Sequence, residues 1–443
     1  MPVNCPEELY RLKKKTAADA VELIVDGKPL ALSMGVSQPP ALMSALADRV
    51  RRGSMTHLPV YYMHGASHSV GNLFHPVCLD VVKPHSLFLS ASDRRIQKAG
   101  LEQGKIWLQH VPCTFHQVGR LLTESVGCDS FMVTVSRMDR HGYMSLGTNC
   151  DYATELVRSA KQVIVEVNDT MPRVFGEALI HVSEVTALVE NSVPVPEVLP
   201  TSPGTEDEII AQHIVELIPD GATIQMGVGG VPNAVASYLK DHNDLGLHTE
   251  LMVPGLMGLI KRGNITGREK TLHRLKHLFT LALGNRELYD FMDDNPSLAG
   301  YPASYINNPE VIAKNDRMIS VNSALQIDLT GQINAEAIGG REYSGPGGQL
   351  DFVRGAFASR EGKSFVALHS TARAGSISRI VPRLETAATD PRMDTHYVVT
   401  EHGIVNLKGL SISQRAEKLI GLAEPKFRDE LRFQAIENGY IAS

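Results

Sequence analysis

Short apolar runs alternate along the chain with segments in which apolar residues recur at helical spacing. The apolar runs, which we predict to be buried strands, are residues 87–89, 106–108, 131–135 and 163–167. The segments with helical spacing are residues 40–51, 151–159 and 232–241. Nearly continuous apolar runs are typical of strands covered on both faces of a parallel sheet. The alternation therefore predicts an α/β fold with mostly parallel sheets.

One segment interrupts this alternation. Residues 191–204 contain four prolines and no apolar periodicity, which is typical of an extended linker. We therefore predict an N-terminal α/β domain at residues 1–190, a linker at 191–205, and a C-terminal α/β domain at 206–443.

The two predicted domains repeat a short pattern. Met34-Gly35-Val36 precedes Pro40, and Met226-Gly227-Val228 precedes Pro232, with the same spacing inside each copy. Each copy combines a strand, a turn, a proline and a helix, and proline is favoured in the first turn of a helix. The repetition predicts two similar domains that arose by duplication.

Charge and cysteine usage exclude several classes of protein. The chain has 43 Lys and Arg against 49 Asp and Glu, a net charge of −6, so a cationic nucleic-acid surface is not expected. No apolar run reaches the roughly 18 residues that a membrane helix needs. The five cysteines include no CxxC pair, so we predict neither a disulfide framework nor a metal site. A cytoplasmic protein is expected.

Two glycine-rich segments and one isolated carboxylate are candidates for chemistry. Residues 227–230 are Gly-Val-Gly-Gly between a predicted strand and helix, where backbone N–H groups can approach an anion. The spacing matches neither a Walker loop nor GxGxxG, so a nucleotide site is not favoured. Residues 345–348 are Gly-Pro-Gly-Gly before Asp351. The alternatives are a tight strand–helix turn for the first segment and a surface loop for the second.

Glu250 is the isolated carboxylate. It stands among apolar residues just after a strand-like stretch, where burial raises the pKa of a carboxyl group and nearby N–H donors lower it. The alternative is a structural glutamate held by hydrogen bonds.

Taken together, these segments resemble the acetyl-CoA hydrolase/transferase family, in particular its 4-hydroxybutyrate and butyryl-CoA:acetate CoA-transferases. The matching segments, in the family's order, are residues 166–173, 180–184, 227–232, 241–250, 321–323, 331–334 and 345–352. The resemblance implies two similar open α/β domains of the CoA-transferase, NagB/RpiA-like kind, with the active site between them. It also implies a homodimer or higher homo-oligomer.

The resemblance implies a covalent, ping-pong mechanism in which Glu250 is the nucleophile and forms a glutamyl-CoA thioester. It implies no metal and no tightly bound cofactor, because coenzyme A enters as the substrate thioester. The implied oxyanion and CoA contacts are Gly227, Val228, Gly229, Gly230, Asn322, Gly347, Gly348 and Arg373. For Arg373 the alternative is an exposed ion pair.

The chain departs from the family pattern at residues 252–254, which are Met-Val-Pro, and at residues 61–68. These departures are similar to those of bacterial itaconate CoA-transferases and indicate an altered acyl pocket. The predicted pocket residues are Tyr61, Tyr62, His64 and Met252. The acceptor suggested by this resemblance is itaconate, with succinyl-CoA as donor; otherwise it is butyrate, 4-hydroxybutyrate or acetate. The alternatives are an acyl-CoA hydrolase and, in another class, a sugar-phosphate isomerase-like or ligand-sensing protein.

Overall fold

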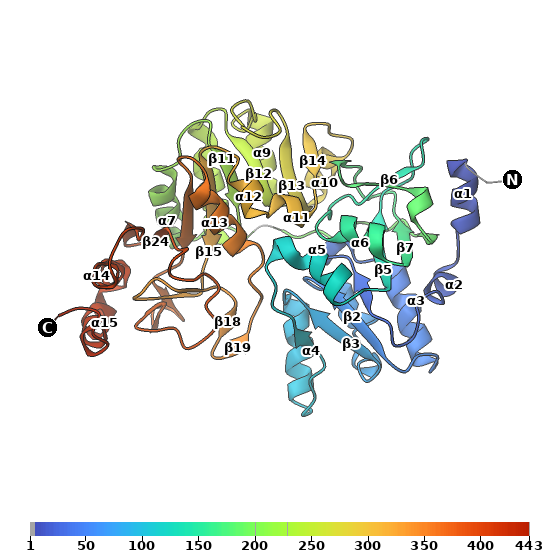
Figure 1. The fold of residues 1–443 in the computed structure, drawn as a ribbon, viewed down its shortest axis with the longest axis horizontal. Helices are drawn as coiled ribbons and strands as arrows, with labels where there is room; N and C mark the ends of the chain where they lie inside the picture. The colour runs from blue at the N-terminus through green and yellow to red at the C-terminus, as the bar shows by residue number, and fades with distance from the viewer. Residues whose placement is uncertain (1–4, 200, 228, 443) are drawn as a thin grey trace. The chain divides into compact units, whose positions relative to one another are not determined.

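The computed structural model describes residues 5–199, 201–227 and 229–442. The chain forms two compact units, and neither unit is continuous in sequence (Figure 1). The first unit comprises residues 1–198 and 278–306, and the second comprises 199–277 and 307–443. Residues 278–306 thus belong to the N-terminal unit, although we placed them in the predicted C-terminal domain. The division at residues 191–205 stays a prediction about folding domains.

The first unit is built on a seven-stranded sheet with the order β10-β7-β5-β1-β2-β3-β4. All neighbours in this sheet are parallel. The strands are β1 (Leu30–Leu32), β2 (Leu58–Tyr62), β3 (Val82–Ser86), β4 (Gln109–His110), β5 (Ser130–Val135), β7 (Gln162–Val167) and β10 (Ala187–Glu190). Buried residues of α2 (Ala17–Val21), α3 (Pro40–Arg51) and α4 (Ala91–Leu101) share a hydrophobic core with this sheet.

Smaller elements complete the first unit. Its other helices are α1 (Pro6–Lys13), α5 (Val118–Arg120), α6 (Ala153–Ser159), α10 (Arg286–Met292) and α11 (Ala303–Ile306). Strand β6 (Tyr143–Ser145) pairs with β9 (Leu179–His181) in antiparallel fashion. Strand β8 (Phe175–Gly176) pairs in parallel with β14 (Leu298–Gly300), and β14 neighbours β13 (His277–Ala282).

The strand predictions at 131–135 and 163–167 and the helix predictions at 40–51 and 151–159 agree with β5, β7, α3 and α6. The strand predictions at 87–89 and 106–108 are wrong, because the strands end or begin beside these runs, at β3 and β4. Leu87, Leu89 and Leu108 are buried in loops. Strand β3 itself carries Lys83, Pro84 and His85, so its sequence lacks the apolar signal that strands usually give.

In the second unit the strand order is β25-β24-β20-β15-β11-β12. Neighbours are parallel except β24 and β25. The strands are β11 (Thr223–Met226), β12 (Gly246–Met252), β15 (Met318–Ser323), β20 (Lys363–Ala367), β24 (Tyr397–Thr400) and β25 (Gly403–Asn406). The α/β class with mostly parallel sheets is thus confirmed.

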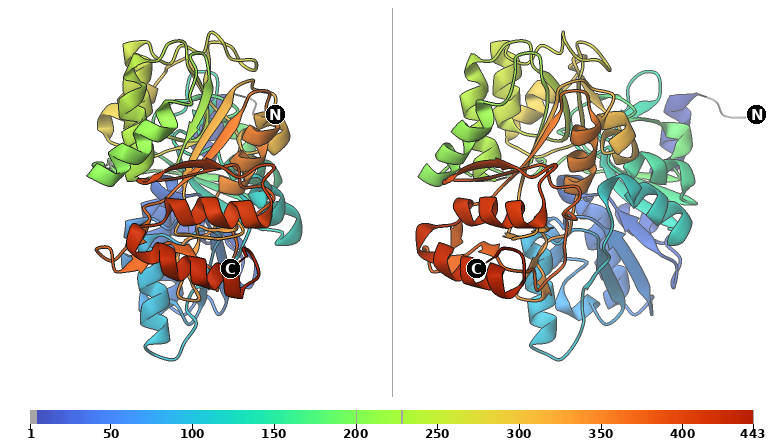
Figure 2. Two further views of the ribbon diagram at one scale, coloured as in Figure 1. Left: turned by 90° about the vertical axis from the view of Figure 1, so that its left-hand side faces the viewer. Right: turned by 60° about the vertical axis from the view of Figure 1, so that its left-hand side comes forward.

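The helices of this unit are α7 (Thr205–Val215), α8 (Gly230–Tyr238), α9 (Pro254–Arg262), α12 (Pro309–Ile312), α13 (Gln349–Ala358), α14 (Ile412–Leu422) and α15 (Pro425–Glu437). Helices α14 and α15 lie side by side and cover a separate small core (Figure 2). The short strands of this unit are β16 (Gln326–Asp328), β17 (Ile333–Asn334), β18 (Ala337–Ile338), β19 (Arg341–Glu342), β21 (Thr371–Ala372), β22 (Ile377–Ser378) and β23 (Ile380–Val381). No helix in the described part of the chain is long and apolar enough to cross a membrane.

The two sheets have the same internal order. Strand β1 lies between β2 and β5, followed by β7 and β10, and β11 lies between β12 and β15, followed by β20 and β24. Pro40 begins α3, and Pro232 lies in the first turn of α8. Met34-Gly35 and Met226-Gly227 of the repeated pattern therefore lie at corresponding strand ends in two similar sheets, and Val228 lies outside the described residues.

Candidate active site

The candidate residues of the second unit cluster at one edge of its sheet. Gly227 follows β11, Glu250 lies near the end of β12, and Asn322 lies near the end of β15. These three strands are parallel neighbours, so their carboxyl ends meet at the same edge, which is where open α/β sheets bind ligands. The topology therefore brings together three residues that are far apart in sequence.

Glu250 accepts two hydrogen bonds inside the second unit. The Nδ2 of Asn307 donates to its Oε2 at 2.6 Å, and the backbone N–H of Gly348 donates to the same carboxyl group. Asn307 is fully buried, whereas Glu250 keeps some exposed surface between its buried neighbours Thr249 and Leu251. The carboxyl group is thus held by two fixed donors and remains reachable.

The surroundings of Glu250 raise the pKa of its carboxyl group to about 7. Loss of water on burial is the largest cause; the hydrogen bond from Asn307 lowers the pKa, the charge of Asp351 raises it, and Gly348 lowers it again. A carboxyl group with this pKa is ionised in a large fraction of molecules at neutral pH. Reactive groups often have such shifted values, so Glu250 can act as a nucleophile or a base.

The 345–348 turn needs glycine for two different reasons. Gly347 has a φ of +55°, a conformation that favours glycine. Gly348 has a φ of −101° and precedes the first residue of α13, so its backbone conformation is open to other residues. A Cβ at Gly348, however, would collide with Oε2 of Glu250 and Nδ2 of Asn307. Glycine at 348 is therefore required by space.

The Gly227 segment packs against the end of β15. The Gly227 N–H donates to the carbonyl of Val321 at 2.9 Å, and a Cβ at Gly227 would lie 3.3 Å from Oδ1 of Asn322. Gly229 has a φ of +121°, and a Cβ at Gly230 would collide with the carboxylate of Asp207. Close approach of backbone and side chains is thus built into this turn. Val228 lies outside the described residues.

The side-chain amide of Asn322 forms hydrogen bonds to other side chains of the second unit. Its Oδ1 accepts from Gln225 Nε2 at 3.2 Å, and its Nδ2 donates to Gln225 Oε1 at 3.3 Å and to Ser320 Oγ at 2.9 Å. These contacts tie β15 to β11. Asn322 therefore fixes the strand ends that flank the candidate site, and its predicted direct contact with CoA stays a prediction.

Arg373 lies on an exposed loop between β21 and β22, with a φ of +49°. Within the described ranges no carboxylate forms an ion pair with its guanidinium, so the alternative of an exposed ion pair has no partner there. An exposed, unpaired arginine is suited to a phosphate group. Its contact with CoA stays a prediction.

The predicted acyl-pocket residues differ in their surroundings. Tyr62 is fully buried in the core of the first unit, where its hydroxyl donates to Asp93 at 2.7 Å. We therefore leave Tyr62 out of the proposed pocket. Tyr61 stacks on His85 with ring centroids 4.5 Å apart, and burial lowers the pKa of His64. Met252 is fully buried at the end of β12 in the second unit.

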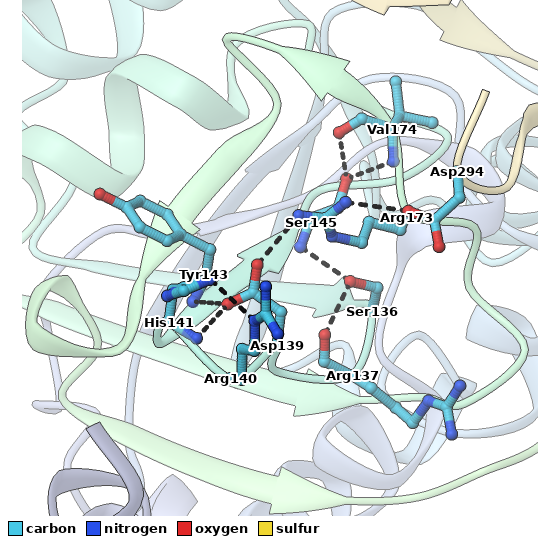
Figure 3. A network of polar contacts seen from close by, with 10 residues as sticks. All are labelled: Ser136, Arg137, Asp139, Arg140, His141, Tyr143, Ser145, Arg173, Val174 and Asp294. Carbon is cyan, nitrogen blue, oxygen red and sulfur yellow. Dashed lines mark hydrogen bonds and ion pairs between the residues drawn. The ribbon is translucent and has the colours of Figure 1, made fainter. Parts of the chain in front are cut away.

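The family-like segment 166–173 organises the first unit. Arg173 donates to Asp139 and to Asp294, both at 2.9 Å (Figure 3). Asp139 in turn accepts from the backbone N–H groups of His141 and Tyr143 and so closes a turn. This network explains the motif by structure, because it joins residues 139–143 to the later segment that carries Asp294.

Asn307 is the residue that our sequence analysis missed. The sequence Asn307-Asn308-Pro309 indicates the start of a helix, and Asn308 does cap α12. No local signal separates the capping asparagine from the one that contacts Glu250, since that contact spans 57 positions. A separate group that could hold a metal ion is Glu401, His402 and Glu424. Its members pair with each other, and Glu401 also accepts from Ser370.

Sequence models of known domains match most of the chain. The acetyl-CoA hydrolase/transferase N-terminal domain matches residues 4–200, and the corresponding C-terminal domain matches residues 284–435. The 4-hydroxybutyrate coenzyme A transferase of Clostridium kluyveri is 39% identical, over 96% of this chain and 97% of that protein.

This chain belongs to the acetyl-CoA hydrolase/transferase family. The succinyl-CoA:cyclohexane-1-carboxylate CoA transferase of Geobacter metallireducens is 38% identical, over 96% of this chain and 95% of that protein. Among solved structures, RipA from Yersinia pestis is 48% identical and superposes with a TM-score of 0.96, covering 98% of this chain and 100% of RipA. Membership confirms the resemblance described from the motifs.

Proposed function

We propose that this protein is a CoA-transferase that moves CoA from an acyl-CoA to a short carboxylic acid, with Glu250 as the nucleophile. The observation that carries the proposal is the Glu250 carboxyl group, which is reachable, has a pKa of about 7, and is held by Asn307 and Gly348. The names of the similar proteins support the reaction class, since the relatives from Clostridium kluyveri and Geobacter metallireducens are both called CoA transferases.

The reaction proceeds in balanced steps. The Glu250 carboxylate attacks the acyl carbonyl and expels CoA thiolate, which leaves an acyl-glutamyl anhydride. The thiolate then attacks the glutamyl carbonyl and releases the acyl group as a carboxylate, which leaves a glutamyl-CoA thioester. The acceptor carboxylate regains CoA through the reverse steps, so the kinetics are ping-pong. The donors of Gly348 and Asn307 stand where negative charge develops on the glutamyl oxygen.

Trapping tests the covalent step. The protein is incubated with acyl-CoA in the absence of an acceptor, reduced with borohydride, digested and analysed by mass spectrometry. We expect the modification on the peptide that contains Glu250, and none in the Glu250→Gln variant. Modification at another residue, or at none, would remove Glu250 from the proposed role.

The same incubation separates the alternatives. A hydrolase releases free CoA thiol steadily without an acceptor, whereas a transferase releases no free thiol and forms the CoA thioester of the acceptor once an acceptor is added. A sugar-phosphate isomerase-like or ligand-sensing protein gives no CoA adduct and binds a sugar phosphate tightly. Thiol release with and without acetate, together with calorimetry using ribose 5-phosphate, distinguishes these outcomes.

For the substrates we propose itaconate as acceptor and succinyl-CoA as donor. The proposal rests on the altered segments 61–68 and 252–254. Burial lowers the pKa of His64 and of His68, so at neutral pH these imidazoles are uncharged N–H donors that suit a second carboxylate. Itaconate, succinate, butyrate, 4-hydroxybutyrate and acetate are compared in competition, with succinyl-CoA and butyryl-CoA as donors. A preference for monocarboxylates would overturn the substrate proposal alone. A cytoplasmic homodimer stays a prediction.

A further inference from the structure

Asp390 is a buried carboxyl group at a fixed place in the second unit. It is fully buried, and its backbone pairs with Ile333 of β17 through two hydrogen bonds of 3.0 and 3.1 Å. Next to it, Thr389 Oγ1 accepts from the N–H of Ala335 at 2.9 Å. Asp390 is thus anchored to the short strand formed by the 331–334 motif.

The side chain of Asp390 reaches the beginning of α13. Its Oδ2 accepts from Nε2 of Gln349 at 2.7 Å, while its Oδ1 has no hydrogen-bond partner in the described part of the structure. Gln349 is the first residue of α13, directly after Gly348, and is itself buried. The hydrogen bond therefore joins the Gly348 turn to the anchored strand.

This link bears on Glu250, because Gly348 donates to that carboxyl group and has no room for a Cβ beside it. A small shift of the turn would move the donor off its acceptor, and hydrogen bonds weaken steeply with poor geometry. We propose that Asp390 is a positioning residue: through Gln349 it holds the Gly348 N–H against Glu250. The proposal rests on the proposed function of Glu250.

The structure offers a matched control on the same two segments. Asp394 lies four residues after Asp390, and its Oδ2 accepts from Nη2 of Arg354 on α13 at 3.0 Å. Arg354 is half exposed, so this ion pair should contribute little. It joins the same loop to the same helix, but further from Gly348. If any loss of contact between this loop and α13 lowers the rate, substitutions of Asp390 and of Asp394 should both do so. If the rate depends on the position of Gly348, only substitution of Asp390 should lower it.

The experiment measures the rate of glutamyl-CoA formation at saturating acyl-CoA in rapid-quench assays. We expect Asp390→Ala and Gln349→Ala each to lower this rate about 10- to 100-fold, as loss of a hydrogen bond to a charged group does, while KM for acyl-CoA changes little. Asp390→Asn keeps an acceptor oxygen for Gln349 and should restore most of the rate. Asp394→Ala should match the unmodified protein. The double variant should be no slower than either single variant.

Backbone hydrogen exchange gives a readout that does not need turnover. Exchange in residues 345–352 should rise in Asp390→Ala and stay normal in Asp390→Asn and Asp394→Ala. An unchanged rate and unchanged exchange in Asp390→Ala would overturn the proposal, as would equal losses in Asp390→Ala and Asp394→Ala. If Asp390→Ala does not fold, the comparison of Gln349→Ala with Asp394→Ala tests the proposal. If the unmodified protein forms no thioester, the function of Glu250 fails, while exchange still tests the Asp390–Gln349 link.

Discussion

Strands β2 and β12 occupy the same position in the two sheets, beside β1 and β11, yet the carboxylates associated with them differ in their surroundings. Asp93 of α4 accepts a hydrogen bond from Tyr62 of β2, whereas Glu250 lies on β12 itself. Near β2, Asp93 is fully buried and accepts from the Tyr62 hydroxyl, the Gly65 N–H and the Ser90 N–H. On β12, Glu250 has two donors and some exposed surface. A buried carboxylate with its hydrogen-bonding capacity filled stabilises a fold; one with fewer partners keeps capacity for chemistry.

Both carboxylates are approached by a glycine. A Cβ at Gly65 would lie 2.6 Å from Oδ1 of Asp93, and a Cβ at Gly348 would collide with Oε2 of Glu250. The same local solution, a bare backbone beside an oxygen, therefore serves structure in the first unit and the candidate site in the second. A glycine next to a carboxylate thus does not by itself indicate catalysis.

The strongest test exchanges each carboxylate for its amide. Glu250→Gln removes the nucleophilic oxygen anion, and we expect transfer to fall by about 10⁴-fold or more with little change in Tm. Asp93→Asn should do the reverse, costing ~2 kcal/mol of unfolding free energy because its donors lose a charged acceptor. Steady-state kinetics and urea unfolding check both. Equal loss of activity in the two variants would erase the distinction.

Substitutions of Gly348 and Gly65 should likewise affect different properties, catalysis in the first case and stability in the second. Gly348→Val places a side chain on Glu250 and Asn307 and displaces a backbone donor, so we expect transfer to fall by roughly 1,000-fold. Gly65→Ala crowds Asp93 and should lower Tm while the remaining folded protein keeps its specific activity. The readouts are kcat per folded molecule and thermal unfolding. Normal turnover in Gly348→Val would make the 345–348 turn a structural loop.

The free energy of unfolding should depend on pH through the ionisation of Glu250. Its folded pKa is about 7, above the ordinary value of 4.5, so the folded state binds the proton more tightly than the unfolded state. The stabilisation is fully present below pH 4.5 and is lost as the pH rises through 7. The stabilisation amounts to at most ~3 kcal/mol, because solvent screens the partly exposed Glu250 and reduces the effect of the pKa shift. Urea unfolding of the protein and of Glu250→Gln from pH 4.5 to 8 measures the difference, and parallel curves would contradict the raised pKa.

The smallest effect concerns Asn307. Asn307→Ala removes one donor to Glu250, and loss of a hydrogen bond to a charged group costs about 10- to 100-fold in rate. The pKa of Glu250 should rise further, because the ionised form loses a partner. The acidic limb of the pH–rate profile should therefore move to higher pH. Asn308→Ala, which removes the adjacent cap of α12, serves as control, and it should change stability more than the pH profile.

Sequence patterns predicted the parts of this protein that depend on short-range order. The apolar runs of β5 and β7, the helix α3 and the Met34-Gly35 turn could be predicted, because burial and turn chemistry leave local sequence patterns. Strand β3 could not be predicted, because Lys83, Pro84 and His85 give it a composition typical of loops. Glu250 and the 345–348 turn could be singled out from residue types and family motifs. Asn307 and Asp390 could not, because their roles arise from contacts across 57 and 41 positions.

The discontinuity of the first unit has a consequence for the order in which the chain can fold during synthesis. The N–H of Cys150 donates to the carbonyl of Thr280, the N–H of Ala282 donates to the carbonyl of Thr148, and β8 pairs with β14. Thr280, Ala282 and β14 are absent until the ribosome has made residues 278–306. By then residues 199–277, with β11 and β12, have already been synthesised. The N-terminal unit therefore matures only after part of the second unit has been made.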